Sequence, residues 1–78
     1  MPKVIVTVMP KPSVLDPQGV ATAKLMKQSG LAGVGRARVG KSIEIEFESV
    51  PDAAKLEGVA RDLLSNPVIE DFRIETLP

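Results

Sequence analysis

The sequence contains no cysteine and no histidine. Without cysteine there is no disulfide and no thiolate zinc site, and without histidine the commonest zinc ligand and the usual general base near neutral pH are missing. A nucleophile–base pair of the Ser-His or Cys-His type therefore cannot be assembled. Domains of this size often supplement a small core with disulfides, a metal or a partner subunit, and here a partner subunit is favoured.

Aromatic residues, net charge and long apolar runs are also scarce. The 78 residues include only Phe47 and Phe72 as aromatics, and ten basic residues balance ten acidic ones. A nucleic-acid binder usually carries a basic excess, and a membrane span needs about 20 apolar residues in a row. We therefore expect one domain over residues 1–78, with no nucleic-acid or membrane partner and a cytoplasmic location.

The apolar pattern predicts six elements. Strands are expected at 3–9, 33–39, 42–48 and 68–77, because β-branched or alternating residues fill these runs. Asp16 followed by Pro17 predicts the start of a helix that runs to about Ser29, and Gly30 follows as its C-terminal cap. Asp52 predicts the start of a second helix, which Pro67 ends.

The order β-α-β-β-α-β predicts a ferredoxin-like fold, an α+β two-layer sandwich. It has a four-stranded antiparallel sheet with both helices on one face. Gly40 and Lys41 are expected at the tip of a hairpin, and Arg36 and Arg38 would then pair across it with the glutamates of the next strand. The first helix is expected to bury a stripe that includes Leu25 and Met26. The second is expected to bury Leu56, Val59, Ala60, Leu63 and Leu64.

Two glycine strings resemble nucleotide-binding motifs but lie in the wrong place. Residues 35–42 match the G-x-x-x-x-G-K-S string literally, yet they are expected in a strand and hairpin and not between a strand and a helix. Gly30, Gly33 and Gly35 show the dinucleotide spacing in reverse, after a helix. We expect no catalytic residue, metal or cofactor in this chain.

Functions known for the ferredoxin-like fold can be compared with the residue types in this sequence. The central strands lack the stacking aromatics of an RNA-recognition motif, and a soft-metal chaperone would need cysteine pairs. A free-standing small-ligand regulatory domain stays open, with a ligand held by backbone groups in the 10–19 loop.

Four motifs in order resemble one known family over essentially the whole chain. They are an opening strand that ends in Lys-Pro, the run Val14–Gly19, the pair Gly40-Lys41, and the run Leu63–Phe72. Together they resemble the PurS family. Ser65 stands where the family often has alanine, and Ser29 where it often has a large apolar residue.

The resemblance implies the small subunit of a multi-subunit phosphoribosylformylglycinamidine synthase. That complex converts formylglycinamide ribonucleotide, glutamine and ATP to formylglycinamidine ribonucleotide. The implied partners are a glutaminase subunit that releases ammonia and a large synthetase subunit that binds ATP with Mg. The small subunit is implied to dock these two, to assist ammonia transfer and to self-associate as a dimer or tetramer.

Residues expected at partner interfaces, or in the turns and caps that shape them, are structural and not catalytic. They are Asp16, Pro17, Gln18, Gly19, Gly40, Lys41, Asn66, Pro67 and Glu70. Lys41 is expected to reach a partner or a phosphate. Self-association is expected through the edge of the last strand or of the hairpin, because unpaired strand edges invite pairing with another chain.

Overall fold

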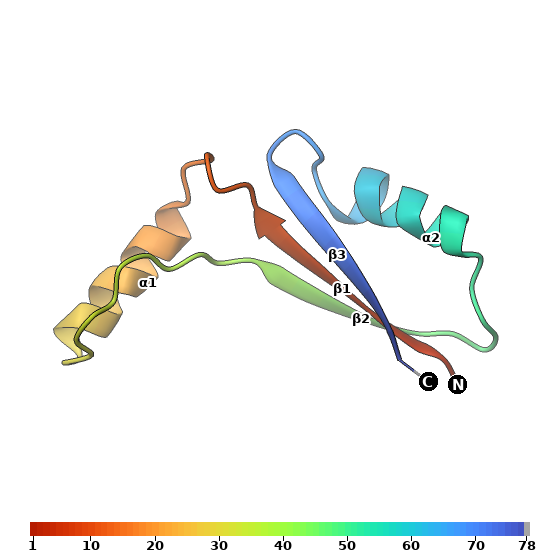
Figure 1. Ribbon diagram of the computed structural model, residues 1–78, viewed down its shortest axis with the longest axis horizontal. Coiled ribbons are helices and arrows are strands. Elements are labelled where there is room, and N and C mark those ends of the chain that lie inside the picture. Colours follow the sequence, from red (N-terminus) through yellow and green to blue (C-terminus); the bar gives the residue numbers. More distant parts are fainter. Residues whose placement is uncertain (78) are drawn as a thin grey trace.

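A computed structural model describes residues 1–77 of the chain. Its elements are β1 (Lys3–Pro10), α1 (Pro17–Gln28), β2 (Lys41–Glu46), α2 (Ala53–Val59), the wider helical turn η1 (Ala60–Leu64) and β3 (Glu70–Leu77). The strands form one antiparallel sheet in the order β2-β1-β3, so the first strand of the chain is the central one (Figure 1). None of the helices described is long and apolar enough to cross a membrane.

The core lies on one face of β1. Val4, Val6 and Val8 alternate along the strand and are fully buried, because successive side chains point to opposite faces of a sheet. The neighbouring strands add partly buried residues to this face, namely Ile43, Ile45, Phe72 and Ile74. β1 pairs with both neighbours, so it is the element on which the sheet depends.

Helix α2 and the turn η1 cover the valine face. Leu56, Ala60 and Leu64 pack against the core, whereas two other residues of the expected stripe are exposed, Leu63 at 77% and Val59 at 40%. The helical run ends at Ser65, whose buried hydroxyl donates to the carbonyl oxygens of Ala60 and Arg61 at 2.8 and 3.2 Å. The serine at this position therefore satisfies the last carbonyls of the helical run.

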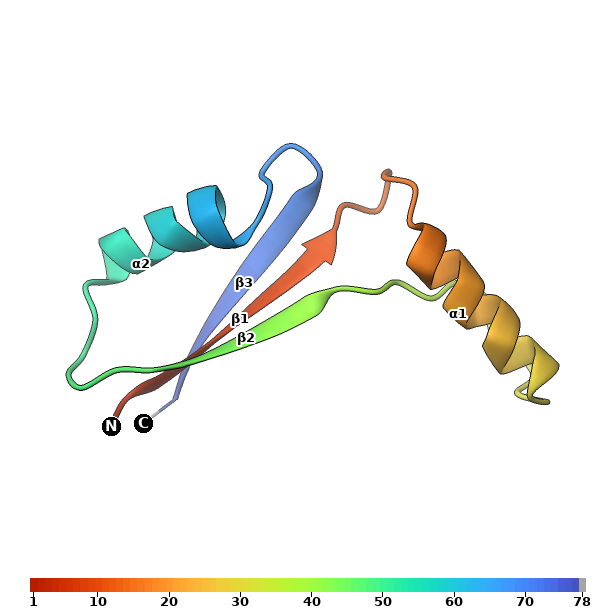
Figure 2. The same ribbon diagram turned by 180° about the vertical axis from the view of Figure 1, so that it is seen from behind.

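The opposite face of the sheet is polar, as the sequence predicts. Lys3 forms an ion pair with Glu44 there, at 2.6 Å, and this contact raises the pKa of Lys3. Within residues 1–77, no helix covers this face (Figure 2).

The expected four-stranded ferredoxin-like sheet is wrong. Residues 33–39 form no strand, the sheet has three strands, and only α2 lies against it. The chain runs on from residue 36 into β2 without a hairpin, and Gly40 lies directly against the Val8 carbonyl and Met9. β1 ends at Pro10, and Pro12 follows, so the central strand offers no ladder of donors for residues 33–39. The alternative function, a free-standing small-ligand regulatory domain, was based on the ferredoxin-like fold and therefore has no support from the observed sheet.

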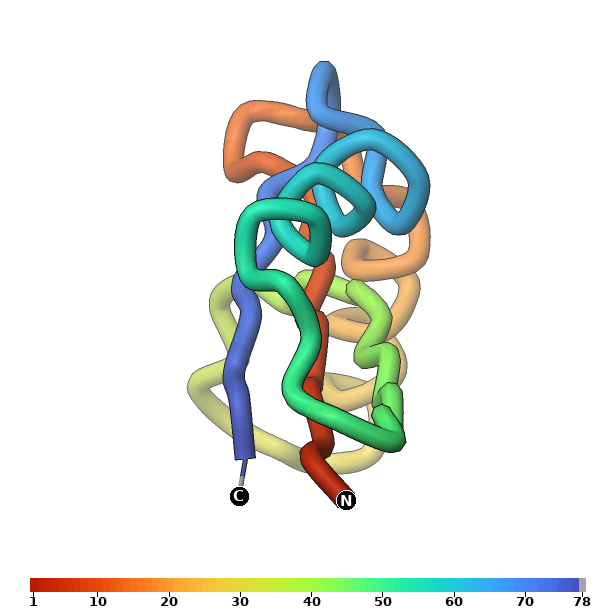
Figure 3. Tube along the Cα trace, turned by 90° about the vertical axis from the view of Figure 1, so that its right-hand side faces the viewer, coloured from red at the N-terminus to blue at the C-terminus, as the bar shows by residue number. Residues whose placement is uncertain are grey.

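Helix α1 lies outside this core. We call residues 11–40 the arm and the remaining described residues the body. The arm projects from one end of a molecule 46 Å long, and the body lies at the other (Figure 1). Seen along the long axis, the arm lies behind the body (Figure 3). The radius of gyration over Cα atoms is 15.7 Å, whereas a compact chain of this length has about 11.5 Å. The projecting arm therefore accounts for the elongated shape.

The buried valine row generates the first prediction. Val6→Ala removes two methyl groups from a fully buried site and should lower the free energy of unfolding by about 2 kcal/mol. Val68→Ala is the matched control, because Val68 is 78% exposed and its truncation should cost less than about 0.5 kcal/mol. Urea titration monitored by circular dichroism measures both. Equal losses would contradict the assignment of the core.

Candidate functional site

The carboxylate of Asp16 joins the start of α1 to Val39, near the end of the arm, where the chain leads back into the body. One oxygen accepts from the backbone N–H of Gly19 at 3.0 Å, as the expected N-cap of α1, with Pro17 in the first turn. The other oxygen accepts from the N–H of Val39 at 2.9 Å. These bonds, led by that from Val39, lower the pKa of Asp16, because they favour the charged form. One side chain thus fixes the start of α1 beside a segment 23 residues away.

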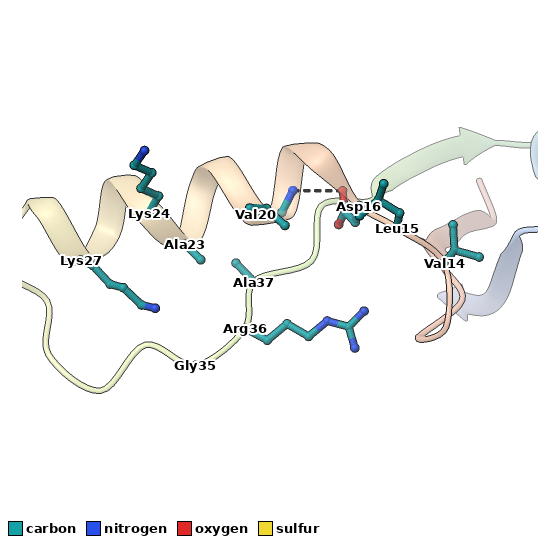
Figure 4. A pocket seen from close by; sticks show the side chains of 11 residues that line it. Val14, Leu15, Asp16, Val20, Ala23, Lys24, Lys27, Gly35, Arg36 and Ala37 are labelled. Atoms are coloured by element: carbon teal, nitrogen blue, oxygen red, sulfur yellow. Dashed lines mark hydrogen bonds between the residues drawn. The ribbon is translucent and has the colours of Figure 1, made fainter.

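Small residues let the helix approach this segment closely. Gly19 and Ala23 are the buried residues of α1, and Figure 4 shows Ala23 facing Ala37. A Cβ on Gly19 would overlap the carbonyl oxygen of Ala37. The expected buried stripe is therefore misplaced: Leu25 is 63% and Met26 39% exposed.

Two arginines join residues 36–38 to the prolines at the end of β1. Arg36 donates to the carbonyl oxygen of Pro12 at 2.7 Å, and Arg38 donates to that of Pro10. The prolines end the β-ladder, and the guanidinium groups take up carbonyls that the ladder leaves free. The expected Arg–Glu pairs across a hairpin are wrong.

A groove of about 370 Å³ lies between α1 and residues 35–37 (Figure 4). Its apolar lining comes from Val14, Leu15, Val20, Ala23 and Ala37. Three cations, Lys24, Lys27 and Arg36, also line it. Leu15 is 81% and Val20 63% exposed, so the apolar lining is open to solvent in the single chain. Such a groove suits an apolar group that carries negative charge beside it.

Charge is divided between the arm and the body. The arm has five basic residues and one acidic residue, a formal charge of +4, whereas the rest of the chain has five basic and nine acidic residues, a charge of −4. The net charge of zero conceals this division. Opposite charge at the two ends of one molecule favours association with a complementary surface.

The expected interface residues fall into two groups. Asp16, Pro17, Gln18 and Gly19 lie in the arm at the start of α1, and Gly40 lies at the end of the arm, directly before β2. The backbone carbonyl of Gln18 accepts from the Thr22 hydroxyl at 2.8 Å. Lys41 is exposed at the start of β2 and lies opposite Val8, so its expected place at a hairpin tip is wrong.

Asn66, Pro67 and Glu70 lie elsewhere, in the turn before β3. The side chain of Glu70 accepts from the backbone N–H of Asn66 at 2.7 Å, and the Asn66 side chain accepts from Val68 at 3.1 Å. The Glu70 N–H donates back to the Asn66 carbonyl, also at 2.7 Å. These residues shape a turn, as expected from their type. The structure does not bring them together with Asp16.

The groove was not predicted from the motifs. Its lining residues are ordinary apolar and basic types, and what brings them together is the position of α1. The one feature of the sequence that indicates this groove is the excess of basic residues over positions 11–40. In residues 1–77, no group of three or more acidic, histidine or cysteine side chains is placed to hold a metal ion.

Comparison with known proteins gives concordant results. The family described as "PurS: Phosphoribosylformylglycinamidine (FGAM) synthase" matches residues 3–78. The PurS subunit of this synthase from Mycobacterium leprae is 39% identical over 74 residues, which cover 95% of this chain and 94% of the relative. The subunit from Synechocystis is 40% identical over 68 residues, 83% of this chain and 68% of the relative.

Solved structures agree with the sequence comparison. PurS from Bacillus subtilis superposes with a TM-score of 0.86 at 39% identity, over 100% of both chains. A chain of PurLQS from Thermotoga maritima superposes with a TM-score of 0.78 at 26% identity, over 99% of both chains. The three-stranded fold with its projecting arm is therefore similar to known structures along its whole length.

The close approach at Gly19 generates the second prediction. Gly19→Ala should lower the free energy of unfolding by about 1–3 kcal/mol, because the new methyl group overlaps a backbone oxygen and forces the arm to shift. Gly58→Ala is the control, since its nearest neighbour would be Arg61 Nη2 at 3.8 Å. That substitution should stabilise by about 0.5–1 kcal/mol. Thermal melts compare the two, and stabilisation by both would contradict the contact.

The two bonds of Asp16 generate a third prediction, on pH. Its pKa is lower in the folded chain, so its stabilisation is complete above the unfolded pKa of about 3.9 and is lost as pH falls through the folded pKa. Asp16→Asn should therefore melt below the wild type at pH 6, and the gap should narrow from about pH 4 downwards. The gap for Val68→Ala, which changes no titrating group, should stay constant. A gap for Asp16→Asn that does not change with pH would contradict the bonds.

Proposed function

This chain belongs to the PurS family, the small subunits of the multi-subunit phosphoribosylformylglycinamidine synthase of purine biosynthesis, and we propose that it works there by docking alone. The family match over residues 3–78 carries this proposal. In it the chain holds the glutaminase subunit on the synthetase subunit and assists the passage of ammonia between them. ATP with Mg would be bound by the synthetase partner.

The chemistry of the chain supports a role without catalysis. Histidine and cysteine are missing from the sequence. Three carboxylates accept from backbone N–H groups in structural roles: Asp16 joins the start of α1 to Val39, Asp52 accepts from two N–H groups at the start of α2, and Glu70 closes a turn. Groups that are tied to backbone N–H donors are poorly suited to act as general acids or bases, which must exchange a proton with a substrate.

The shape of the chain supports docking. Much of the apolar surface of the arm is open to solvent, and the body leaves one face of the sheet uncovered. A small domain with such surfaces gains stability from association. We therefore include self-association to a dimer or tetramer in the proposal. β3 lies at the edge of the sheet and offers an unpaired strand side for it. A cytoplasmic location stays a prediction.

Glutamine-dependent synthesis is the fourth prediction. Purified synthetase and glutaminase should form product from glutamine only when this chain is added, because ammonia must pass between the two subunits. With an ammonium salt as nitrogen donor, the synthetase should form product whether or not the chain is present. The measurement is the initial rate of product formation with each donor.

The arm provides the matched comparison. Asp16→Ala removes the bond that holds the start of α1 to Val39 within the arm, whereas Asp52→Ala removes a helix cap in the body. If the arm takes part in docking, Asp16→Ala should raise the concentration of chain needed for half-maximal glutamine-dependent rate more than Asp52→Ala does. A glutamine-dependent rate that is the same without the chain would overturn the proposed function.

A further inference from the structure

The turn before β3 displays three apolar side chains to solvent. Pro67, Val68 and Ile69 are consecutive and exposed, and Val68 at their centre is 78% exposed. We call these three residues the tip. It projects beyond the start of β3 (Figures 1 and 3). No residue of the tip is among those that pack against the buried valines, so the core is formed without it.

Hydrogen bonds to the backbone hold the tip in one shape. The carbonyl oxygen of Asn66 accepts from the N–H groups of Ile69 and Glu70 at 3.1 and 2.7 Å. The Glu70 carboxylate accepts from the Asn66 N–H at 2.7 Å, and the Asn66 side chain accepts from the Val68 N–H at 3.1 Å. The Ile69 carbonyl accepts from the Lys11 N–H at 2.8 Å, which ties the tip to the end of β1. Because the tip is already ordered, docking costs little conformational entropy.

The chain around the tip is acidic. Residues 62–71 contain three acidic residues and no basic one. Lys11 and Arg61 pair with two of these carboxylates at exposed sites, where ion pairs contribute little. Within residues 1–77, Glu70 forms no ion pair. The surface that complements the tip is therefore an apolar socket with lysine or arginine at its rim.

This charge distribution disfavours pairing of the tip with the tip of a second copy. A two-fold contact places the same surface of both copies face to face. Glu70 and Asp71 of each copy would then meet their own counterparts, and like charges at an interface are repulsive. The bodies that carry the tips are also of like charge, −4 each. A different protein with a basic surface fits better.

We propose that the tip docks in an apolar, basic-rimmed socket on the synthetase subunit. The inference rests on the proposed function and names the surface of this chain that serves it. In that function the synthetase binds two phosphate-bearing compounds, ATP and a ribonucleotide, and a positive field attracts such anions. The glutaminase substrate, glutamine, carries no net charge. The side chain of Val68 enters the socket, and Glu70 lies toward its rim.

Binding to each subunit separately tests this contact. Val68→Ser removes the apolar anchor, while Val68→Lys and Val68→Glu place opposite charges there. Val50→Ser and Val50→Lys are matched controls, because Val50 is 81% exposed, adjoins a proline and lies outside the tip. Sedimentation velocity of the full chain measures binding to purified synthetase, binding to purified glutaminase and self-association. Circular dichroism shows that each variant is folded.

The expected results depend on the kind of substitution. Val68→Ser should weaken binding to the synthetase at least about tenfold, since a buried aliphatic anchor is lost. Val68→Lys should weaken it more than Val68→Glu does, because a lysine would face a basic rim. The Val50 variants should bind as the wild type does. Glutaminase binding and self-association should be unchanged in every Val68 variant.

Three results would overturn the inference. They are unchanged synthetase binding by the Val68 variants, equal weakening by the Val50 variants, and weakening confined to glutaminase binding or self-association, which would assign the tip to that occupant. If a Val68 variant fails to fold, Val68→Ala replaces it and should weaken synthetase binding about fivefold. A wild-type chain that binds neither subunit would overturn the proposed function as well, whereas wild-type binding with unchanged variants overturns the inference alone.

Discussion

The Asp16 carboxylate accepts one backbone hydrogen bond from Gly19 and one from Val39, and these two bonds hold the two halves of the arm together. It joins the first turn of α1 to Val39, immediately before the chain enters β2. The groove between α1 and residues 35–37 depends on where this carboxylate holds the helix.

A second constraint is the size of the core. One face of β1 supplies the fully buried valines, and α2 with η1 is enough to cover it. The residues packed against this core come from the three strands, Phe47, α2 and η1, and none comes from α1. The exposed leucines and valines of the arm are therefore a consequence of the fold, and they need a partner that the single chain does not provide.

Local signals allowed accurate prediction of single elements but not of their arrangement. Asp16 with Pro17, Asp52 and Gly30 marked the helix ends where the structure has them, because capping depends on neighbouring residues. The alternation of β1, β2 and β3 was also readable. Residues 33–39 have a strand pattern but no partner strand, and pairing is a non-local property. The groove could not be predicted because it depends on the direction of α1.

The family assignment and the physical features agree on one kind of role. A chain without histidine or cysteine, with charge divided between its ends and apolar surface on a projecting arm, is suited to contact other proteins. The motifs that resembled nucleotide-binding sites have ordinary structural roles: Gly40, in the string at residues 35–42, lies against the end of β1, and Gly30 ends α1 with a φ of 90°. These features support the docking role proposed for this chain.

The central claim is that assembly with a partner covers the exposed apolar surface of the arm. Amide hydrogen exchange of α1 tests this claim most directly. In the dilute single chain, the amides of α1 should exchange much faster than those of β1, because few contacts hold the arm to the body. In the assembled synthase, the α1 amides should become protected while β1 changes little. Protection of α1 equal to that of β1 in the dilute monomer, or no gain on assembly, would contradict the account.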